Sequence, residues 1–282
     1  MQVFEITIPV KSPDRPILID FSGDVHLGSK SCDVEMFEKA VTKTIKDKAY
    51  YVGMGDAVDS IVPADSRYDR ADVSETKFIY NDVEWDLGSL DGQHAYYEMI
   101  MERIAKTGRL LGLHYGNHGS KVYVATTNNL MKGIAARTKC RFMGYFAHWK
   151  IHFSYKGKRI NTITLVTWHG HGGSASPAGV INVHERLRKS FDADLYVCGH
   201  YHQLITFSRV RLGTDGKRSI GKFCWHGVSG SFLRTYRPGT DNYGCREAYD
   251  PLSVGFLRAT IIPSKGITNL GVIDMDQEIG GV

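Results

Sequence analysis

The stretch that decides the fold is Ile17-Leu-Ile-Asp-Phe-Ser-Gly-Asp-Val-His26, a short apolar run that ends in polar residues beside a glycine. Its first five residues have the length and apolar content of a buried strand. The next segment, 33–48, places apolar residues at helical spacing behind Asp33, which is a good N-cap. A second apolar run, 50–54, leads directly into Gly55-Asp56. Strand, helix and strand in this order predict a β–α–β unit, and therefore a parallel sheet.

The same pattern recurs along the chain, because several other strand-like runs also end in Asp, Asn or His beside glycine. The five clusters are Asp24-Val-His26, Gly55-Asp56, Gly116-Asn-His118, His169-Gly-His171 and Gly199-His-Tyr-His202. In α/β sheets, ligands bind at the carboxyl ends of the strands. We therefore expect the five clusters to converge on one place.

The rest of the chain is expected to belong to the same domain, which would span residues 1–282 with a helical insertion at about 57–108. Helices are predicted at 93–106 and about 180–190, and a hairpin at 151–167. Beyond the last cluster, strand-like runs alternate with turn signals to about Asp274, which is typical of an antiparallel β region.

Composition excludes several classes of protein. A chain with 42% hydrophobic and 23% charged residues is not disordered, collagen-like or a coiled coil. No apolar run approaches the ~18 residues of a membrane span, and the first ten residues do not resemble a secretory signal. Five widely spaced cysteines without a CxxC pair indicate reduced thiols, and hence a cytoplasmic protein. The net charge of +5 is a mild bias towards anionic partners.

The clusters offer donors of a particular chemistry. Carboxylate, imidazole and amide groups together suit Mn, Fe, Zn or Ni. The absence of cysteine from the five clusters argues against a structural zinc site. Seven or eight donors are too many for one ion of this kind. They suit two ions held close together by a shared carboxylate, with positions left open for water and a phosphate oxygen.

The sequence resembles the calcineurin-like metallophosphoesterases in its motifs and in their order. From Asp24 to His202 these motifs are D-x-H, G-D, G-N-H, H-G and G-H-x-H. The resemblance covers about two-thirds of the chain. It implies an α/β fold, the two-sheet α/β/β/α sandwich of that family, which the C-terminal β region would complete. It also implies a hydrolase with two divalent ions, of which Mn²⁺ is the first expectation and Fe, Zn or Ni the alternatives. A hydroxide bridging the two ions would attack the phosphate ester.

Carried over residue by residue, the resemblance implies a role for each member of the clusters. The metal ligands would be Asp24, His26 and His202 for the first ion, Asn117, His169 and His200 for the second, and Asp56 as the bridge. His118 would lie just outside the ions, as proton donor or phosphate stabiliser. Family members commonly carry an acidic residue directly after G-N-H, where this chain has Gly119. A carboxylate from elsewhere, or direct phosphate contact by the imidazolium, would have to replace it.

Three further residues are candidates for contact with the substrate. His171 is left over from its cluster, and it would either contact the substrate or support a metal ligand. Arg234 and Arg237 follow a Gly-Ser-Phe turn in a loop that could overhang the site, where a guanidinium would bind phosphate.

The sequence indicates the substrate less specifically than it indicates the metal ligands. Excess positive charge outside the Asp-rich clusters favours a phosphodiester of nucleic acid, DNA or RNA, or of a nucleotide. The insertion after Asp56 would narrow the entrance, which favours a strand end or a single strand over an intact duplex. The alternative is a phosphomonoesterase, acting on a nucleotide or a phosphoprotein with the same metals. A catalytically silent metal-binding module is disfavoured, because no ligand position is replaced.

Overall fold

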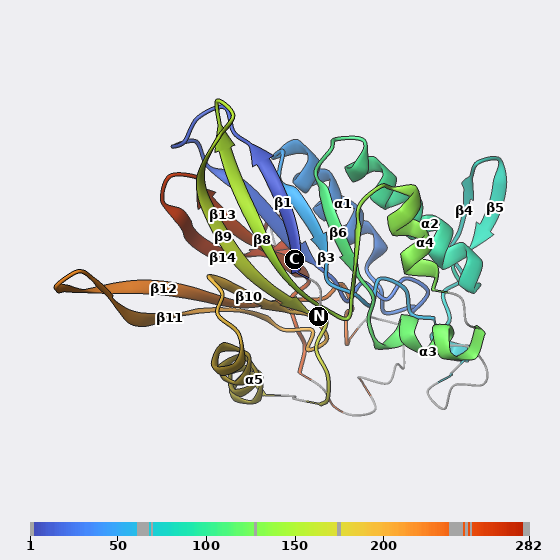
Figure 1. Ribbon diagram of the computed structural model, residues 1–282. Helices are drawn as coiled ribbons and strands as arrows, with labels where there is room; N and C mark the ends of the chain where they lie inside the picture. The colour runs from blue at the N-terminus through green and yellow to red at the C-terminus, as the bar shows by residue number, and fades with distance from the viewer. Residues whose placement is uncertain are drawn as a thin grey trace.

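Two six-stranded sheets form the centre of the protein (Figure 1). The computed structural model describes residues 3–60, 68, 70–126, 129–173, 176–236, 245, 248 and 250–278. The first sheet has the order β14-β13-β2-β3-β6-β7. Its strands are β2 (Ile17–Ser22), β3 (Tyr50–Gly53), β6 (Leu110–His114), β7 (Arg141–Gly144), β13 (Gly255–Ile262) and β14 (Gly266–Asp274). Since β2, β3, β6 and β7 are parallel, they all end at the same edge of the sheet, as the β–α–β pattern predicted.

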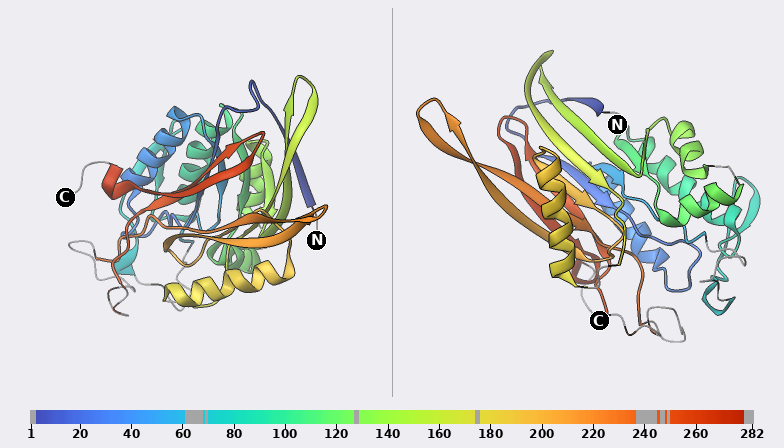
Figure 2. Two further views of the ribbon diagram at one scale, coloured as in Figure 1. Left: turned by 90° about the vertical axis from the view of Figure 1, so that its left-hand side faces the viewer. Right: turned by 60° about the horizontal axis from the view of Figure 1, so that its bottom comes forward.

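The second sheet has the order β1-β8-β9-β10-β12-β11. Its strands are β1 (Val3–Pro9), β8 (Phe146–Tyr155), β9 (Lys158–Trp168), β10 (Leu195–Cys198), β11 (Leu204–Asp215) and β12 (Arg218–Ser229). Strands β8 and β9 form the predicted hairpin, while β9 and β10 are parallel and end side by side. The long hairpin of β11 and β12 projects beyond the body of the protein (Figure 2).

The two sheets pack face to face through a continuous apolar core. Phe21 and Val52 of the first sheet and Trp149, Leu165 and Val197 of the second are all fully buried in this layer. Alternate residues of each strand point into the layer, since successive side chains of a strand face opposite sides. This core holds the carboxyl ends of the two sets of parallel strands next to each other.

Helices cover the outer face of each sheet. Helices α1 (Val34–Lys46), α2 (Leu90–Ala105) and α4 (Leu130–Arg137) pack on the first sheet, and α5 (Pro177–Ser190) packs on the second (Figure 1). The side chain of Asp33 accepts a hydrogen bond from the backbone N–H of Met36 at 3.1 Å, as expected of an N-cap. The layers are therefore helix, sheet, sheet, helix, and the predicted two-sheet α/β/β/α sandwich is confirmed.

The segment 57–108 contains both a hairpin and a helix. The 3₁₀ turn η1 (Arg70–Asp72) precedes strands β4 (Lys77–Tyr80) and β5 (Val83–Asp86), and α2 follows them. The sequence indicated the helix but no hairpin, because both strands of the β4–β5 hairpin have only four residues and are largely exposed. Helices α3 (Asn117–Thr126) and α7 (Met275–Glu278) complete the described elements. No helix of the described chain is long and apolar enough to cross a membrane.

A buried ion pair fastens the C-terminal strands to the β–α–β unit. Asp20 of β2 is fully buried, and Arg258 of β13 donates to both of its carboxylate oxygens at 2.6 and 2.8 Å. Arg258 also contacts Asp47 at the end of α1, and Thr44 donates to Asp20 at 2.7 Å. This network ties β13, β2 and α1 together close to the first cluster.

Candidate metal centre

The structure brings the five clusters together at the adjoining carboxyl ends of the two sheets. Asp24 and His26 follow β2, Asp56 follows β3, and Asn117 opens α3 just after β6, all on the first sheet. His169 follows β9, and His200 and His202 follow β10, on the second sheet. Three groups have their ligand atoms within 4.8 Å of one another: Asp24, His26 and His202; Asp56, His169 and His200; and His26, Asp56 and His118. The first two contain six of the seven predicted ligands.

The backbone at these positions is in a conformation that non-glycine residues seldom adopt. Five of the predicted ligands have a positive φ: Asp24 (51°), His26 (52°), Asp56 (43°), His200 (73°) and His202 (57°). A left-handed conformation costs about 1–3 kcal/mol at such a residue, and it persists only where the surroundings enforce it. The turns after β2, β3 and β10 therefore hold strain at the residues whose side chains point to the centre.

Asp24 presents a carboxylate oxygen that the described protein does not satisfy. The side chain is fully buried, and Oδ2 accepts a hydrogen bond from the backbone N–H of His200 at 2.8 Å. Oδ1 has no hydrogen-bond partner among the described residues, and Nε2 of His202 lies 3.5 Å from it. A buried carboxylate oxygen without a partner is costly, and a cation bound there removes that cost.

His169 indicates a second cation position. Its Nδ1 lies 2.9 Å from the backbone carbonyl of Met54, which can only accept, so Nδ1 carries a proton. Nε2 then faces Oδ2 of Asp56 and Oδ1 of Asn117, each at 3.1 Å. Burial lowers the pKa of His169, but the Asp56 carboxylate outweighs burial and raises this pKa to about 9. The site thus requires a positive charge between Nε2 and these oxygens, and a metal ion can supply it in place of the proton.

His26 and His202 lie next to each other at the position predicted for the first ion. Their Nε2 atoms are 3.2 Å apart, and Nδ1 of His26 lies 3.3 Å from Oδ1 of Asp59. A carboxylate that fixes Nδ1 leaves Nε2 to bind a metal, which is the usual arrangement around a ligating histidine. The donor set fits a divalent ion here too, because nitrogen and oxygen donors of Asp24, His26 and His202 converge within 4.8 Å of one another.

The carboxylate of Asp56 lies within 4.8 Å of ligand atoms from both predicted ion positions, namely His26 of the first and His169 and His200 of the second, as expected of a bridging ligand. Oδ2 faces His169, while Oδ1 accepts the backbone N–H of His118 at 3.0 Å. The positive charge of His169 and His118 outweighs burial and holds the pKa of Asp56 well below its usual value. A Cβ at Gly116 would lie 2.1 Å from Oδ1 of Asp56, so only glycine allows this approach.

Asp59 is the functional residue that sequence reasoning missed. Nδ1 of His118 donates to the backbone carbonyl of Asp59, and Oδ1 of Asp59 lies 3.5 Å from the same nitrogen. This carboxylate provides what Gly119 does not. An acidic residue three positions after Asp56, in the same loop, was the signal that could have found it.

The candidates for substrate contact have different surroundings. His171 is exposed and lines a groove beside the centre. The Arg234 guanidinium donates to Asp33 and to Asp276, each at 2.6 Å. Arg237 lies outside the described residues. Phosphate contact by His171, Arg234 or Arg237 stays a prediction.

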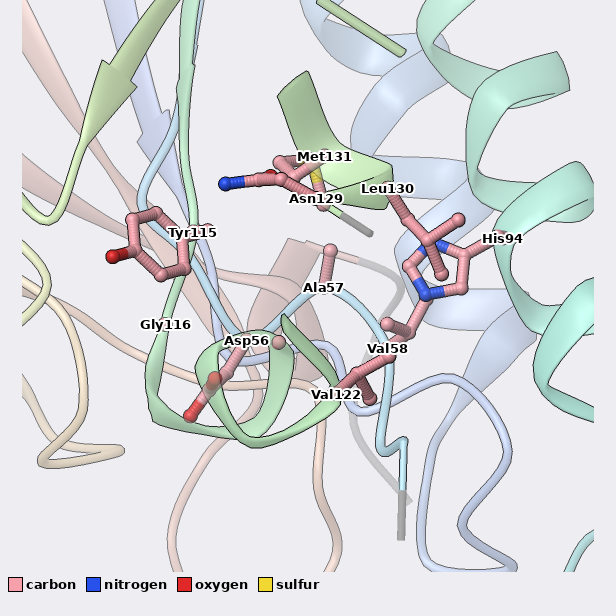
Figure 3. A pocket seen from close by; sticks show the side chains of 11 residues that line it. Asp56, Ala57, Val58, His94, Tyr115, Gly116, Val122, Asn129, Leu130 and Met131 are labelled. Carbon is pink, nitrogen blue, oxygen red and sulfur yellow. The ribbon is translucent and has the colours of Figure 1, made fainter. Parts of the chain in front are cut away.

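A second, narrow pocket lies behind Asp56 (Figure 3). Tyr115, His94, Met131 and Val122 are among the side chains that line it. Its volume of about 10 Å³ is close to the least that holds one water molecule. Burial lowers the pKa of His94 to about 4, so this ring is neutral. The pocket is too small for a phosphate ester.

Comparisons with known proteins give structural likenesses at low sequence identity. No family model matches the chain, and a search of the curated proteins finds no match either. Solved structures similar to it include the phosphoesterase Yfce from E. coli, at 14% identity and a TM-score of 0.39, covering 91% of this chain and 100% of that one. A metallophosphoesterase from Sphaerobacter thermophilus has 11% identity and a TM-score of 0.35, covering 94% and 95%.

A third similar structure is GAP50, the anchor in the inner membrane complex of Plasmodium. It has 11% identity and a TM-score of 0.46, covering 93% of this chain and 85% of that one. The functional interpretation of this chain therefore depends on its own residues.

Proposed function

We propose that the protein is a metallophosphoesterase that uses two divalent ions to hydrolyse phosphodiester bonds. The observation that carries this proposal is Asp56, a buried carboxylate that faces the donors of both predicted ion positions. The unsatisfied Oδ1 of Asp24 and the acceptor pair around Nε2 of His169 support two separate cations. When bound, such ions activate a water nucleophile and offset the negative charge of the phosphate.

The protein's own groups have distinct parts in this proposal. Asp24, His26 and His202 hold one ion, Asn117, His169 and His200 hold the other, and Asp56 keeps the two together. His118, held at Nδ1 by Asp59, presents Nε2 as the atom that exchanges a proton with the leaving oxygen. Mn²⁺ is the first expectation for a mixed carboxylate, imidazole and amide set, with Fe, Zn and Ni as alternatives.

For the substrate we propose nucleic acid or a nucleotide. The net charge of +5 supports this, since the acidic side chains of the centre would be offset by the ions and the basic excess lies elsewhere. A phosphomonoesterase with the same metals is the alternative. The five cysteines form no disulfide and are consistent with a reducing compartment, so we retain the cytoplasm as the expected location.

One comparison tests the proposal. Protein stripped with a chelator is given Mn²⁺ and assayed on bis-p-nitrophenyl phosphate and on p-nitrophenyl phosphate. We expect activity to vanish on chelation, to return with Mn²⁺, and to favour the diester. A preference for the monoester would support the alternative. Bound metal without hydrolysis of either compound would leave a silent metal-binding module.

A further inference from the structure

A groove of about 700 Å³ lies between helix α5 and the loop that follows β9. Its helical wall is formed by Gly179, Asn182, Val183, Glu185, Arg186 and Lys189, which lie along one side of α5. The distance from the first to the last is ten residues, or ~15 Å at the rise of an α-helix. A groove of this length takes an extended ligand rather than a single phosphate group.

The opposite wall connects the groove directly to the metal centre. It is formed by His171, Gly172, Gly173 and Tyr201, which lie next to predicted ligands in the chain. Nε2 of His200 is 3.0 Å from the carbonyl of Gly172, and the Tyr201 hydroxyl donates to the carbonyl of His171 at 2.9 Å. A ligand in this groove therefore has one end beside the second ion position.

The groove carries uncompensated positive charge. Among the described residues, neither Arg186 nor Lys189 has a carboxylate within 4 Å, although both line the groove. The one carboxylate on this wall, Glu185, is already paired with Arg188 at 2.8 Å and with Arg209 at 2.9 Å. Cationic side chains that have no acidic partner and face one groove attract a ligand with several negative charges.

We propose that this groove binds the sugar-phosphate backbone of a single-stranded nucleic acid, with the scissile phosphate at the metal centre. This inference rests on the proposed function, because it assumes that the centre hydrolyses a phosphodiester. It goes further by assigning phosphate contacts to Arg186 and Lys189, and by placing the bound strand along α5. Contacts of this kind position the backbone without reading its sequence, so DNA and RNA share the chemistry that the groove recognises.

The test uses Mn²⁺-loaded protein, labelled single-stranded DNA and RNA 20-mers, and bis-p-nitrophenyl phosphate assayed in parallel. In Arg186→Ala/Lys189→Ala we expect kcat/KM for the oligonucleotide, divided by kcat/KM for the small diester, to fall at least about tenfold. Each lost phosphate contact lowers the salt slope by about 0.7 for a single strand. Between 50 and 200 mM salt, the KM of the variant should therefore rise about sevenfold less than that of the wild type.

The matched control is Lys217→Ala/Arg218→Ala, which removes the same charge at the exposed turn of the β11–β12 hairpin (Figure 2). This control should keep the wild-type ratio and the wild-type salt response. If the α5 double variant does not fold, Lys189→Gln replaces it, since Lys189 is exposed.

The outcomes separate this inference from the proposed function. If the ratio of the two kcat/KM values is unchanged in the α5 variant, or falls equally in the control, the groove does not bind the nucleic acid. Wild-type protein that hydrolyses the small diester but neither oligonucleotide would also overturn this inference, while leaving the phosphodiesterase intact. Protein that hydrolyses none of these compounds with metal bound would contradict the proposed function itself.

Discussion

Nδ1 of His118 donates to the backbone carbonyl of Asp59, and the carboxylate of the same residue lies 3.5 Å from that nitrogen. A carbonyl can only accept, so the proton of the neutral ring is at Nδ1 and the lone pair at Nε2. The same carboxylate faces Nδ1 of His26 at 3.3 Å. Asp59 therefore orients two imidazoles at once, one at a predicted metal position and one beside it.

Asp59→Asn should reduce kcat on the small diester by about 10- to 100-fold, the range found when outer partners of metal-site histidines are removed. The amide keeps the size of the side chain and the backbone carbonyl, but it loses the charge. Because His118 acts on the leaving oxygen, the loss should be larger for diesters with poor leaving groups. A steady-state series of aryl phosphodiesters measures this dependence.

Asp215→Asn is the control for this series, because Asp215 is an exposed carboxylate at the far end of β11. It should behave like the wild type on every diester. A loss in Asp59→Asn that is the same for all leaving groups would mean that Asp59 acts through the metal ligand His26 alone.

His118→Ala should still bind two metal ions and yet turn over slowly. The reason is that His118 is held by Asp59 and the predicted ligand sets are complete without it. We expect a loss of about 10²–10⁴-fold in kcat, the usual contribution of a positioned acid or base. Metal content measured by plasma spectrometry is the decisive quantity, with His148→Ala on β8 as the control. A variant that loses one ion would make His118 a ligand, which its grouping with His26 and Asp56 allows.

Asp56→Asn should lose metal affinity and activity far more than stability. The amide oxygen can still accept the N–H of His118, which Oδ1 of Asp56 accepts at 3.0 Å, so the loop keeps its shape. What disappears is the negative charge shared by two cations. Calorimetric titration with Mn²⁺ should show at least about tenfold weaker binding, while the metal-free variant should still fold. Tight binding of two ions by this variant would remove Asp56 as the bridge.

The sequence predicted the β–α–β unit and the convergence of the five clusters because both depend on local signals. A strand-like run that ends in Asp, Asn or His beside glycine is visible in one short window, and parallel strands bring such ends to one edge. The site then follows from the order of the clusters, without knowledge of any side-chain contact.

Contacts between distant parts of the chain had no such signal. Arg234 pairs with both Asp33 and Asp276, and this role depends on the fold bringing the start of α1 and helix α7 to the same arginine. Asp59 contacts His118 only because the loops after β3 and β6 lie side by side. The cations along α5 have no local signal either, because only the fold shows that they border a groove.

Arg258→Met should destabilise the fold by about 3–5 kcal/mol, because it leaves Asp20 buried without its partner. Burial already raises the pKa of Asp20 in spite of Arg258. Urea unfolding of metal-free protein measures the free energy. Arg103→Met is the control, since Arg103 pairs with Glu38 at 4.0 Å on the surface and should contribute about 1 kcal/mol or less. Equal effects of the two substitutions would show that the Asp20 network adds nothing beyond a surface ion pair.

On the buried face of α5, His184 packs against His226 of β12 among aromatic rings. His184 is fully buried, and its ring is edge-on to His226 at 5.4 Å and to Phe207 at 5.6 Å. Neither ring nitrogen of His184 has a hydrogen-bond partner among the described residues. Burial, with His226 beside it, lowers the pKa of His184 to about 3. The folded protein therefore holds this ring neutral.

The lowered pKa of His184 makes the fold sensitive to acid. An unfolded histidine titrates near pH 6.5, so below that pH the unfolded state binds a proton that the folded state excludes. Stability is lost as the pH falls from about 6.5 towards 3, at about 1.4 kcal/mol per pH unit. His184→Phe removes the titrating group and keeps an aromatic ring at this position. Between pH 7 and pH 5, the unfolding free energy of the metal-free variant should fall by about 2 kcal/mol less than that of the wild type. Urea unfolding at the two pH values measures both drops, and any constant packing effect of phenylalanine cancels within each protein. Equal drops would mean that His184 is protonated in the folded state as readily as in the unfolded one.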